Sequence, residues 1–88
     1  MRIGFRTSPQ NVEWAELEDA WAEAGRHDVF DSGWLNDHFG DPARDRRGTS
    51  FEAMTTLAGL AHFVPGKWVG QTVLAATFRH PAVLAREA

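Results

Sequence analysis

The feature that most constrains this chain is an alternation of strand-like and helix-like segments, which repeats three times within 88 residues. The strand-like segments are short and rich in β-branched and aromatic residues, whereas the segments between them place apolar residues at helical spacing. Successive strand–helix units form a parallel sheet with right-handed crossovers, so the sequence predicts the α/β fold class. The expected elements are, in order, a strand at 3–7, a helix at 12–24, a strand at 29–35, a helix at 54–61, a strand at 68–78 and a helix from Pro81.

The ends of the expected helices carry sequence signals. Asn11 is the predicted N-cap of the first helix, and Gly25 is placed to end it. The letters TSFE at 49–52 have the pattern of a capping box ahead of the second helix, and Pro65 stops that helix. His80 precedes a proline at the position where the start of a helix tolerates proline best.

The composition is that of one ordinary folded domain, spanning residues 1–88. Hydrophobic residues make up 43% of the chain and charged residues 24%, which is typical of a globular protein with a single core. The net charge of -3 gives no basic surface for nucleic acid or for an anionic membrane, and no window approaches the roughly 20 apolar residues of a membrane span. The chain has no cysteine and begins without the apolar segment of a signal peptide, so we expect a cytoplasmic protein.

One pair of residues is a candidate for chemistry: Asp37 and His38 follow the second predicted strand. Ligands of parallel α/β sheets bind at the carboxyl ends of the strands. An imidazole titrates near neutral pH, and a neighbouring carboxylate can orient it or hold its charge, so the pair is suited to proton transfer. The alternative is that both residues are solvated or cap the loop, which is the more common role of such a pair.

Three segments, in their order along the chain, resemble the N-terminal part of the luciferase-like flavin and deazaflavin oxidoreductases. They are DSGWLNDHF at 31–39, SFEAMTTLA at 50–58 and VLAATFRHPA at 73–82. The Asp-His-Phe form of the first segment is similar to the members that use the deazaflavin coenzyme F420 rather than FMN. The resemblance extends over nearly the whole chain, and it implies a TIM-type (β/α)8 barrel, hydride transfer at the deazaflavin ring, and a dimer.

The resemblance also assigns site residues. His38 is expected beside the reactive face of the ring, where it protonates or stabilises charge during hydride transfer, and Asp37 is expected next to it in the pocket. A bulge with a non-proline cis peptide, which supports the ring from behind, is expected at Thr72 and Val73. For Thr72 and Val73 the alternative is an ordinary strand. For the protein as a whole, the alternative within the enzyme class is an FMN-dependent monooxygenase.

A complete barrel of this type has eight strand–helix units in about 250 residues, whereas this chain has three. We therefore expect the first three βα units of a barrel, inactive on their own, with the remainder supplied in the same protein or by a second chain. The substrate is not predicted, because the loops that select it in such barrels belong to later units. The alternative from a different class is a non-catalytic assembly module, whose apolar sheet pairs with itself or with a partner.

The remaining histidines and the basic residues of the 36–48 loop are more simply structural. His62 is expected near the C-terminus of a helix and His80 at the start of one, and no zinc-binding spacing is present, so we expect no metal site. Acidic residues alternate with the basic ones of the loop, which favours a solvated loop over contact with coenzyme phosphate. These basic residues are Arg44, Arg46 and Arg47.

The four tryptophans and one glycine are expected to contribute to packing. The core or the helix–sheet interface is the expected place of Trp14, Trp21 and Trp68. Trp34 is expected either in such a position or at the candidate pocket beside Asp37 and His38. Gly33, inside the second predicted strand, indicates a bulge or the close approach of a ligand.

Overall fold

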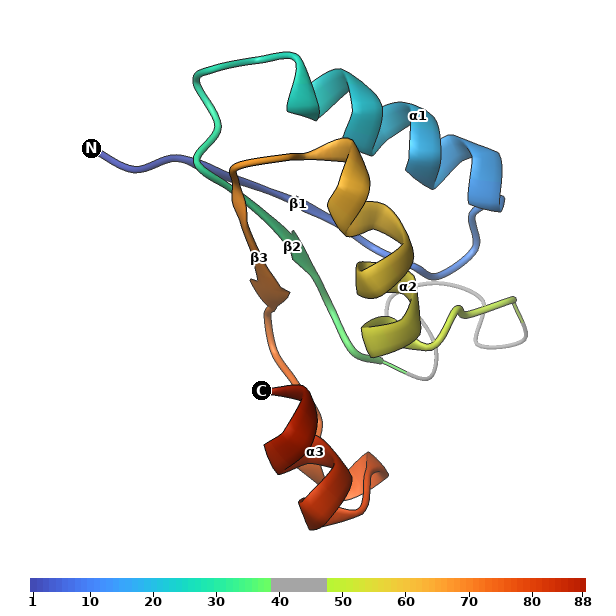
Figure 1. Cartoon of the computed structure of the whole chain (residues 1–88). Coiled ribbons are helices and arrows are strands. Elements are labelled where there is room, and N and C mark those ends of the chain that lie inside the picture. The colour runs from blue at the N-terminus through green and yellow to red at the C-terminus, as the bar shows by residue number, and fades with distance from the viewer. Residues whose placement is uncertain (39–47) are drawn as a thin grey trace.

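The computed structural model of the chain describes residues 1–38 and 48–88 (Figure 1). Helices and strands alternate as the sequence predicts. The elements are β1 (Gly4–Thr7), α1 (Trp14–Gly25), β2 (Ser32–Leu35), α2 (Ala53–Leu60), the 3-10 helix η1 (Ala61–Phe63), β3 (Trp68–Gln71), the 3-10 helix η2 (Ala76–Phe78) and α3 (Pro81–Glu87).

The three strands form one parallel sheet in the order β1-β2-β3. Gly4 of β1 lies opposite Ser32 of β2, which in turn lies opposite Trp68 of β3. The predicted α/β fold with parallel strands is therefore confirmed. Within the described residues the sheet is open, with β1 and β3 at its edges, so closure into a barrel stays a prediction.

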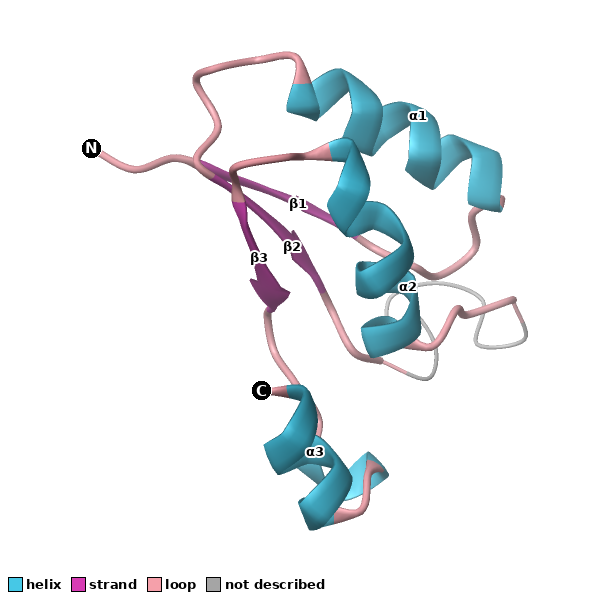
Figure 2. Cartoon of the chain, in the orientation of Figure 1, coloured by secondary structure: helices cyan, strands magenta, loops and turns pink. Residues whose placement is uncertain are grey.

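The two longer helices cover one face of the sheet (Figure 2). Both α1 and α2 lie over this face, whereas α3 lies beyond the carboxyl ends of the strands (Figure 1). Successive side chains of a strand point to opposite faces. Thr7 and Leu35 accordingly point toward the helices, and Trp34 points to the other face, which no described helix covers.

The hydrophobic core lies between the sheet and these two helices. Trp21 of α1, Leu35 of β2 and Leu60 of α2 have no exposed surface. The indole Nε1 of Trp21 donates a hydrogen bond of 2.9 Å to the hydroxyl of Thr7, so its one polar atom is satisfied within the core. The ring of Phe5 packs edge-on against the same indole, with ring centroids 5.0 Å apart. One aromatic side chain of α1 thus contacts β1 directly.

At Gly33 two aromatic rings of the core lie close to the backbone of the sheet. A Cβ atom at this position would lie 2.7 Å from Cζ of Phe5 and 2.9 Å from two ring atoms of Trp21. The groups that approach Gly33 closely are therefore core side chains of the chain itself, whereas the sequence predicts a ligand or a bulge there. β2 continues through this residue without a bulge.

On the uncovered face, the ring of Trp34 lies across the neighbouring strands. A Cβ atom on Gly4 of β1 or on Gly70 of β3 would come within 2.8 Å and 2.6 Å of the ring, respectively. Its Nε1 donates to the hydroxyl of Ser32 at 2.8 Å. Trp68 is 75% exposed, contrary to the expectation of a core position, because it lies at the start of an edge strand and points to this same face.

The predicted start signals of the first two helices are displaced. The N-cap of α1 is Glu13, whose backbone N–H donates to the Glu16 carboxylate at 2.7 Å. Asn11 instead has a φ of 55° in the left-handed region, which asparagine tolerates, and it bonds to the carbonyl of Thr49 at 2.8 Å. The N-cap of α2 is Glu52, because Ser50 is engaged in a bridge with Gln10.

The third strand ends earlier than its β-branched and aromatic sequence predicts. β3 stops at Gln71, and the chain then turns into η2 instead of continuing as a strand to Phe78. The backbone N–H of Ala75 donates to the Asp37 carboxylate, so a side chain takes the place of a sheet partner there. None of the described helices has the length and apolar character needed to cross a bilayer.

We expect Gly33→Ala to lower the free energy of unfolding by about 1–3 kcal/mol, because the added methyl group overpacks a filled part of the core. Urea denaturation followed by circular dichroism measures the change. Val83→Ala is the control, since Val83 is 51% exposed on α3 and its truncation should change the stability by less than about 0.5 kcal/mol. Equal stability of Gly33→Ala and the parent chain would contradict the close packing at this position.

Candidate functional site

The carboxyl ends of the three parallel strands meet at one edge of the sheet, and the candidate residues gather there (Figure 1). Asp37 and His38 follow β2, and Thr72 and Val73 follow β3. The backbone N–H of Thr72 donates to the carbonyl of Leu35 at 2.7 Å, which extends the pairing of the two strands by one residue. The two segments therefore leave the sheet side by side, although 34 residues separate His38 from Thr72 in the sequence.

The carboxylate of Asp37 is buried and fully engaged. Its Oδ2 accepts from the backbone N–H of Ala75 at 2.9 Å and from the guanidinium of Arg79. Its Oδ1 accepts from the second terminal nitrogen of Arg79 at 3.2 Å. The side chain is thus committed to the segment after β3, and its role there is to hold that segment.

Glu52 connects the same arginine to the start of α2. Its carboxylate accepts from the backbone N–H groups of Met54 at 3.2 Å and Thr55 at 2.7 Å, which are donors that the helix itself leaves unpaired. It also forms an ion pair with Arg79. We call Asp37, Arg79 and Glu52 the Arg79 network.

The Arg79 network keeps both carboxylates ionised at neutral pH. Burial alone would raise the pKa of Asp37, but the hydrogen bonds from Arg79 and Ala75 outweigh it and lower this pKa. Burial likewise opposes ionisation of Glu52, yet the donors at Thr55 and Met54 and the guanidinium lower its pKa to about 2. The pKa of Arg79 is raised by the two carboxylates, chiefly by its bonds to Asp37.

His38 has a fixed backbone and an exposed side chain. Its carbonyl oxygen accepts from the amide of Gln10 at 3.0 Å and from the hydroxyl of Ser50 at 3.0 Å. His38 is one of the residues that line a pocket of about 320 Å³, which lies within the size range of small-molecule sites. The lining residues of this pocket, which we call the edge pocket, are Asp37, His38, Ser50, Phe51, Glu52, Phe78 and Arg79.

The segment after β3 contains the Thr72–Val73 peptide, which lies beyond the end of the strand and not in a bulge within it. The peptide bond between Thr72 and Val73 is cis, as predicted. The side chain of Val73 is 67% exposed, whereas the hydroxyl of Thr72 is buried. Three buried side-chain oxygens have no hydrogen-bond partner among the described residues, all of them at the ends of β2 and β3: Asn36 Oδ1, Gln71 Oε1 and Thr72 Oγ1.

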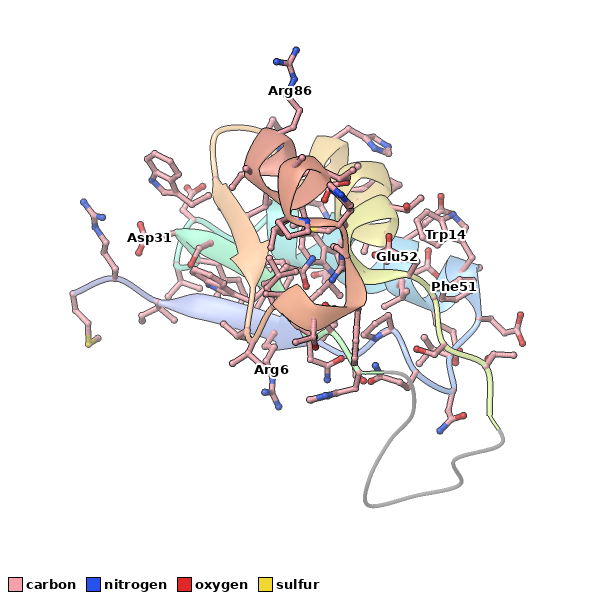
Figure 3. All side chains as sticks on the ribbon, turned by 90° about the horizontal axis from the view of Figure 1, so that it is seen from below. Arg6, Trp14, Asp31, Phe51, Glu52 and Arg86 are labelled. Carbon is pink, nitrogen blue, oxygen red and sulfur yellow. The ribbon has the colours of Figure 1, made fainter. Side chains whose placement is uncertain are left out.

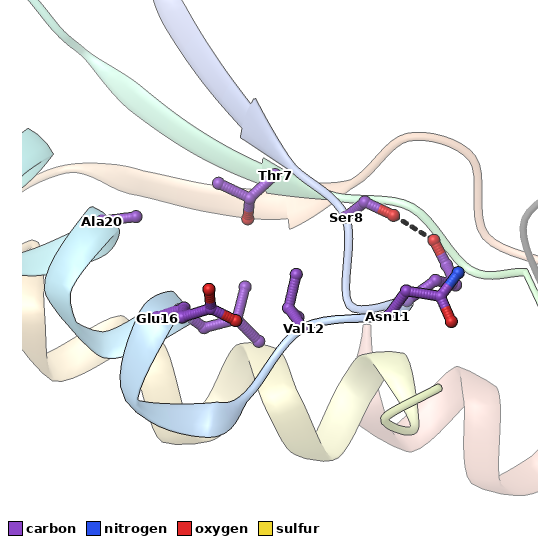
Figure 4. A pocket seen from close by; sticks show the side chains of 8 residues that line it. Thr7, Ser8, Asn11, Val12, Glu16 and Ala20 are labelled. Atoms are coloured by element: carbon purple, nitrogen blue, oxygen red, sulfur yellow. Dashed lines mark hydrogen bonds between the residues drawn. The ribbon is translucent and has the colours of Figure 1, made fainter. Parts of the chain in front are cut away.

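A second pocket, of about 480 Å³, lies between the end of β1 and the first half of α1 (Figure 4). Its single ionisable lining residue is Glu16, whose carboxylate is engaged with the backbone of Glu13. The hydroxyl of Ser8 donates to the side-chain oxygen of Gln10, as the dashed line in Figure 4 marks. This pocket is larger than the edge pocket but offers no comparable group for proton transfer.

The other candidate residues lie elsewhere. His62 belongs to η1, where its ring is 3.9 Å from that of Phe63. His80 caps α3, since its Nδ1 accepts from the backbone N–H of Ala82 at 3.2 Å, which confirms its expected place at a helix start. Within 1–38 and 48–88, no three side chains form a cluster that could hold a metal ion. The loop residues Arg44, Arg46 and Arg47 lie outside the described residues.

Sequence reasoning did not identify Arg79 and Glu52 as site residues. Arg79 is 42 residues from Asp37 and 27 residues from Glu52, so no local spacing links them. The one available signal is an acidic residue directly before a helix, at Glu52, which indicates an N-cap but not its partner.

Comparison of the chain with protein families, with curated proteins and with solved structures found no match in any of the three. The assignment of a function therefore depends on the sequence resemblance and on the geometry of the edge pocket.

We expect the fold to lose stability as the pH falls from about 4.5 to about 2, in part through Glu52. Its pKa is lowered from 4.5 to about 2, so the ionised carboxylate stabilises the native state above pH 4.5, and this contribution disappears as the native state takes up the proton. Glu52→Gln should be less stable at pH 7 and should lose less stability across the same pH range. Urea unfolding at pH 7, 4.5 and 2.5 measures how the free energy of unfolding depends on pH in the parent chain and in Glu52→Gln.

Glu18→Gln is the matched control, because Glu18 lies on α1 and takes no part in the Arg79 network. It should follow the pH dependence of the parent chain. A Glu52→Gln chain with the same pH slope as the parent would show that the ionised carboxylate contributes nothing to the native state.

Proposed function

We propose that this chain carries the coenzyme-facing part of a luciferase-like oxidoreductase that uses coenzyme F420, with His38 acting at the deazaflavin ring. One observation carries the proposal. His38 and the Thr72–Val73 peptide, from separate resembling segments, lie at the ends of adjacent parallel strands, where ligands of α/β sheets bind.

The residues of this edge suit a flat heteroaromatic ring with polar margins. Val73 supplies exposed apolar surface, and the ring of Phe78 lines the edge pocket. Asn36 and Thr72, at the ends of the same two strands, each have a buried side-chain oxygen without a hydrogen-bond partner among the described residues. The pocket volume of about 320 Å³ fits a ring system, and the coenzyme tail would extend beyond it.

The chemistry assigned to the chain is proton transfer beside a hydride acceptor. When bound, the deazaflavin supplies two-electron hydride chemistry. The imidazole of His38 takes up the proton that the substrate releases when it is oxidised, and returns it in the reverse direction. The hydrogen bonds from Gln10 and Ser50 fix the backbone of His38, which is one of the residues that line the pocket. Asp37 adds a fixed negative charge to the same wall.

FMN is the alternative coenzyme at the same edge, since it shares the ring shape. A second candidate function, the assembly module, is favoured by the uncovered face of the sheet, where Trp68 is 75% exposed at an edge strand. Such a face and two open edges can bind a second copy or a chain that completes the barrel. We place the protein in the cytoplasm, and the support is its lack of cysteine.

We expect coenzyme F420 to bind the folded chain and to change its fluorescence on titration. His38→Ala should weaken binding by about tenfold, which corresponds to ~1.4 kcal/mol for one lost contact. His62→Ala is the control, because His62 lies on η1 away from the edge pocket, and it should bind like the parent chain.

The same titration with FMN compares the two coenzymes. Tighter binding of FMN would move the proposal to the flavin branch of the family. If neither coenzyme binds while circular dichroism shows a folded chain, the enzyme proposal fails. Concentration-dependent association in analytical ultracentrifugation would then support the assembly module.

A further inference from the structure

The Arg79 network joins three segments that are distant in the sequence. Asp37 follows β2, Glu52 is the N-cap of α2, and Arg79 lies between η2 and α3. The side chain of Arg79 is 11% exposed and that of Asp37 9%, so this pair is largely removed from water. Because water screens it little, the pair is stronger than an ordinary surface ion pair.

Both terminal nitrogens of the Arg79 guanidinium form hydrogen bonds. Its two terminal nitrogens contact the two oxygens of Asp37, in the bidentate arrangement that arginine and a carboxylate form. One of these nitrogens also contacts Glu52, and the other lies 3.4 Å from the carbonyl of Ala75. Lysine has a single ammonium group and cannot reproduce this set of contacts.

These contacts build one wall of the edge pocket. Three of its seven lining residues belong to the Arg79 network, and a fourth, Phe78, immediately precedes Arg79 in the chain. The segment from Ala75 to Arg79 is held against the end of β2 by the bonds that Asp37 accepts. In the described part of the chain, loss of Arg79 leaves the Ala75 amide as the remaining bond between this segment and Asp37.

We propose that Arg79 is a positioning residue, which holds the η2 segment against the carboxyl end of β2 and so forms the ligand pocket beside His38. It acts through Asp37 and Glu52, since both carboxylates are already engaged with its guanidinium. The part of this inference that concerns the ligand rests on the proposed function. The part that concerns the position of the segment does not.

The first experiment measures amide hydrogen exchange by NMR in Arg79→Met, Arg79→Lys and Arg86→Met chains. The reporter is the Ala75 amide, which is bonded to Asp37, and the reference is the Thr72 amide, which is bonded to Leu35 in the sheet. We expect exchange at Ala75 to rise about tenfold in Arg79→Met and by a smaller factor in Arg79→Lys, with little change at Thr72.

Arg86→Met is the matched control. Arg86 also lies at the C-terminal end of the chain, but its side chain points away from the body of the molecule (Figure 3). It should leave both amides unchanged. Equal increases at Ala75 and Thr72 in Arg79→Met would mean global destabilisation and would overturn the inference, as would an unchanged Ala75 amide. If Arg79→Met does not fold, Arg79→Lys decides by the same comparison.

The second experiment titrates the same chains with coenzyme F420. We expect Arg79→Met to weaken binding about tenfold. Faster exchange at Ala75 with unchanged affinity would overturn the role of Arg79 in the pocket. If the parent chain binds no F420, the proposed function fails, and the exchange measurement still decides the position of the segment.

Discussion

The burial of Trp21 between α1 and the sheet is the contact on which the rest of the structure depends. Its indole packs on Gly33 of β2 and against Phe5 of β1, and its nitrogen donates to Thr7 at the end of β1. One side chain therefore attaches a helix to two strands. A shift of one residue in either strand would turn these partners to the opposite face, so the packing also fixes the register. The separate parallel pairing of β2 with β3, which runs from Ser32 opposite Trp68 to Leu35 opposite Gln71, brings the ends of these two strands together at the edge pocket.

At the carboxyl ends of the strands, polar contacts rather than apolar packing hold the segments together. The strand pairing ends at Gln71 and Thr72, and beyond it carboxylates accept the backbone N–H groups that have no strand or helix partner. Arg79 neutralises part of the resulting charge and is itself held by both carboxylates. The result is a pocket wall whose charged groups stay ionised at neutral pH, next to one exposed imidazole on a fixed backbone.

The sequence predicts the parts of this structure that follow from local periodicity. The alternation of strand and helix, the parallel sheet and the position of His38 after a strand all depend on patterns within a few residues. The early end of β3 and the caps at Glu13 and Glu52 do not, because they depend on partners elsewhere in the chain. The network around Arg79 was missed for the same reason, since an ion pair across 42 residues has no local signature.

The most direct test of the account is NMR mapping of coenzyme F420 on the isotope-labelled chain. We predict that the largest shifts fall on His38, Thr72 and Val73, with intermolecular contacts between the deazaflavin ring protons and the imidazole of His38. Shifts confined to the uncovered face around Trp34 and Trp68, or to the pocket between β1 and α1, would contradict the account, because the coenzyme would then bind away from the edge where the two resembling segments meet.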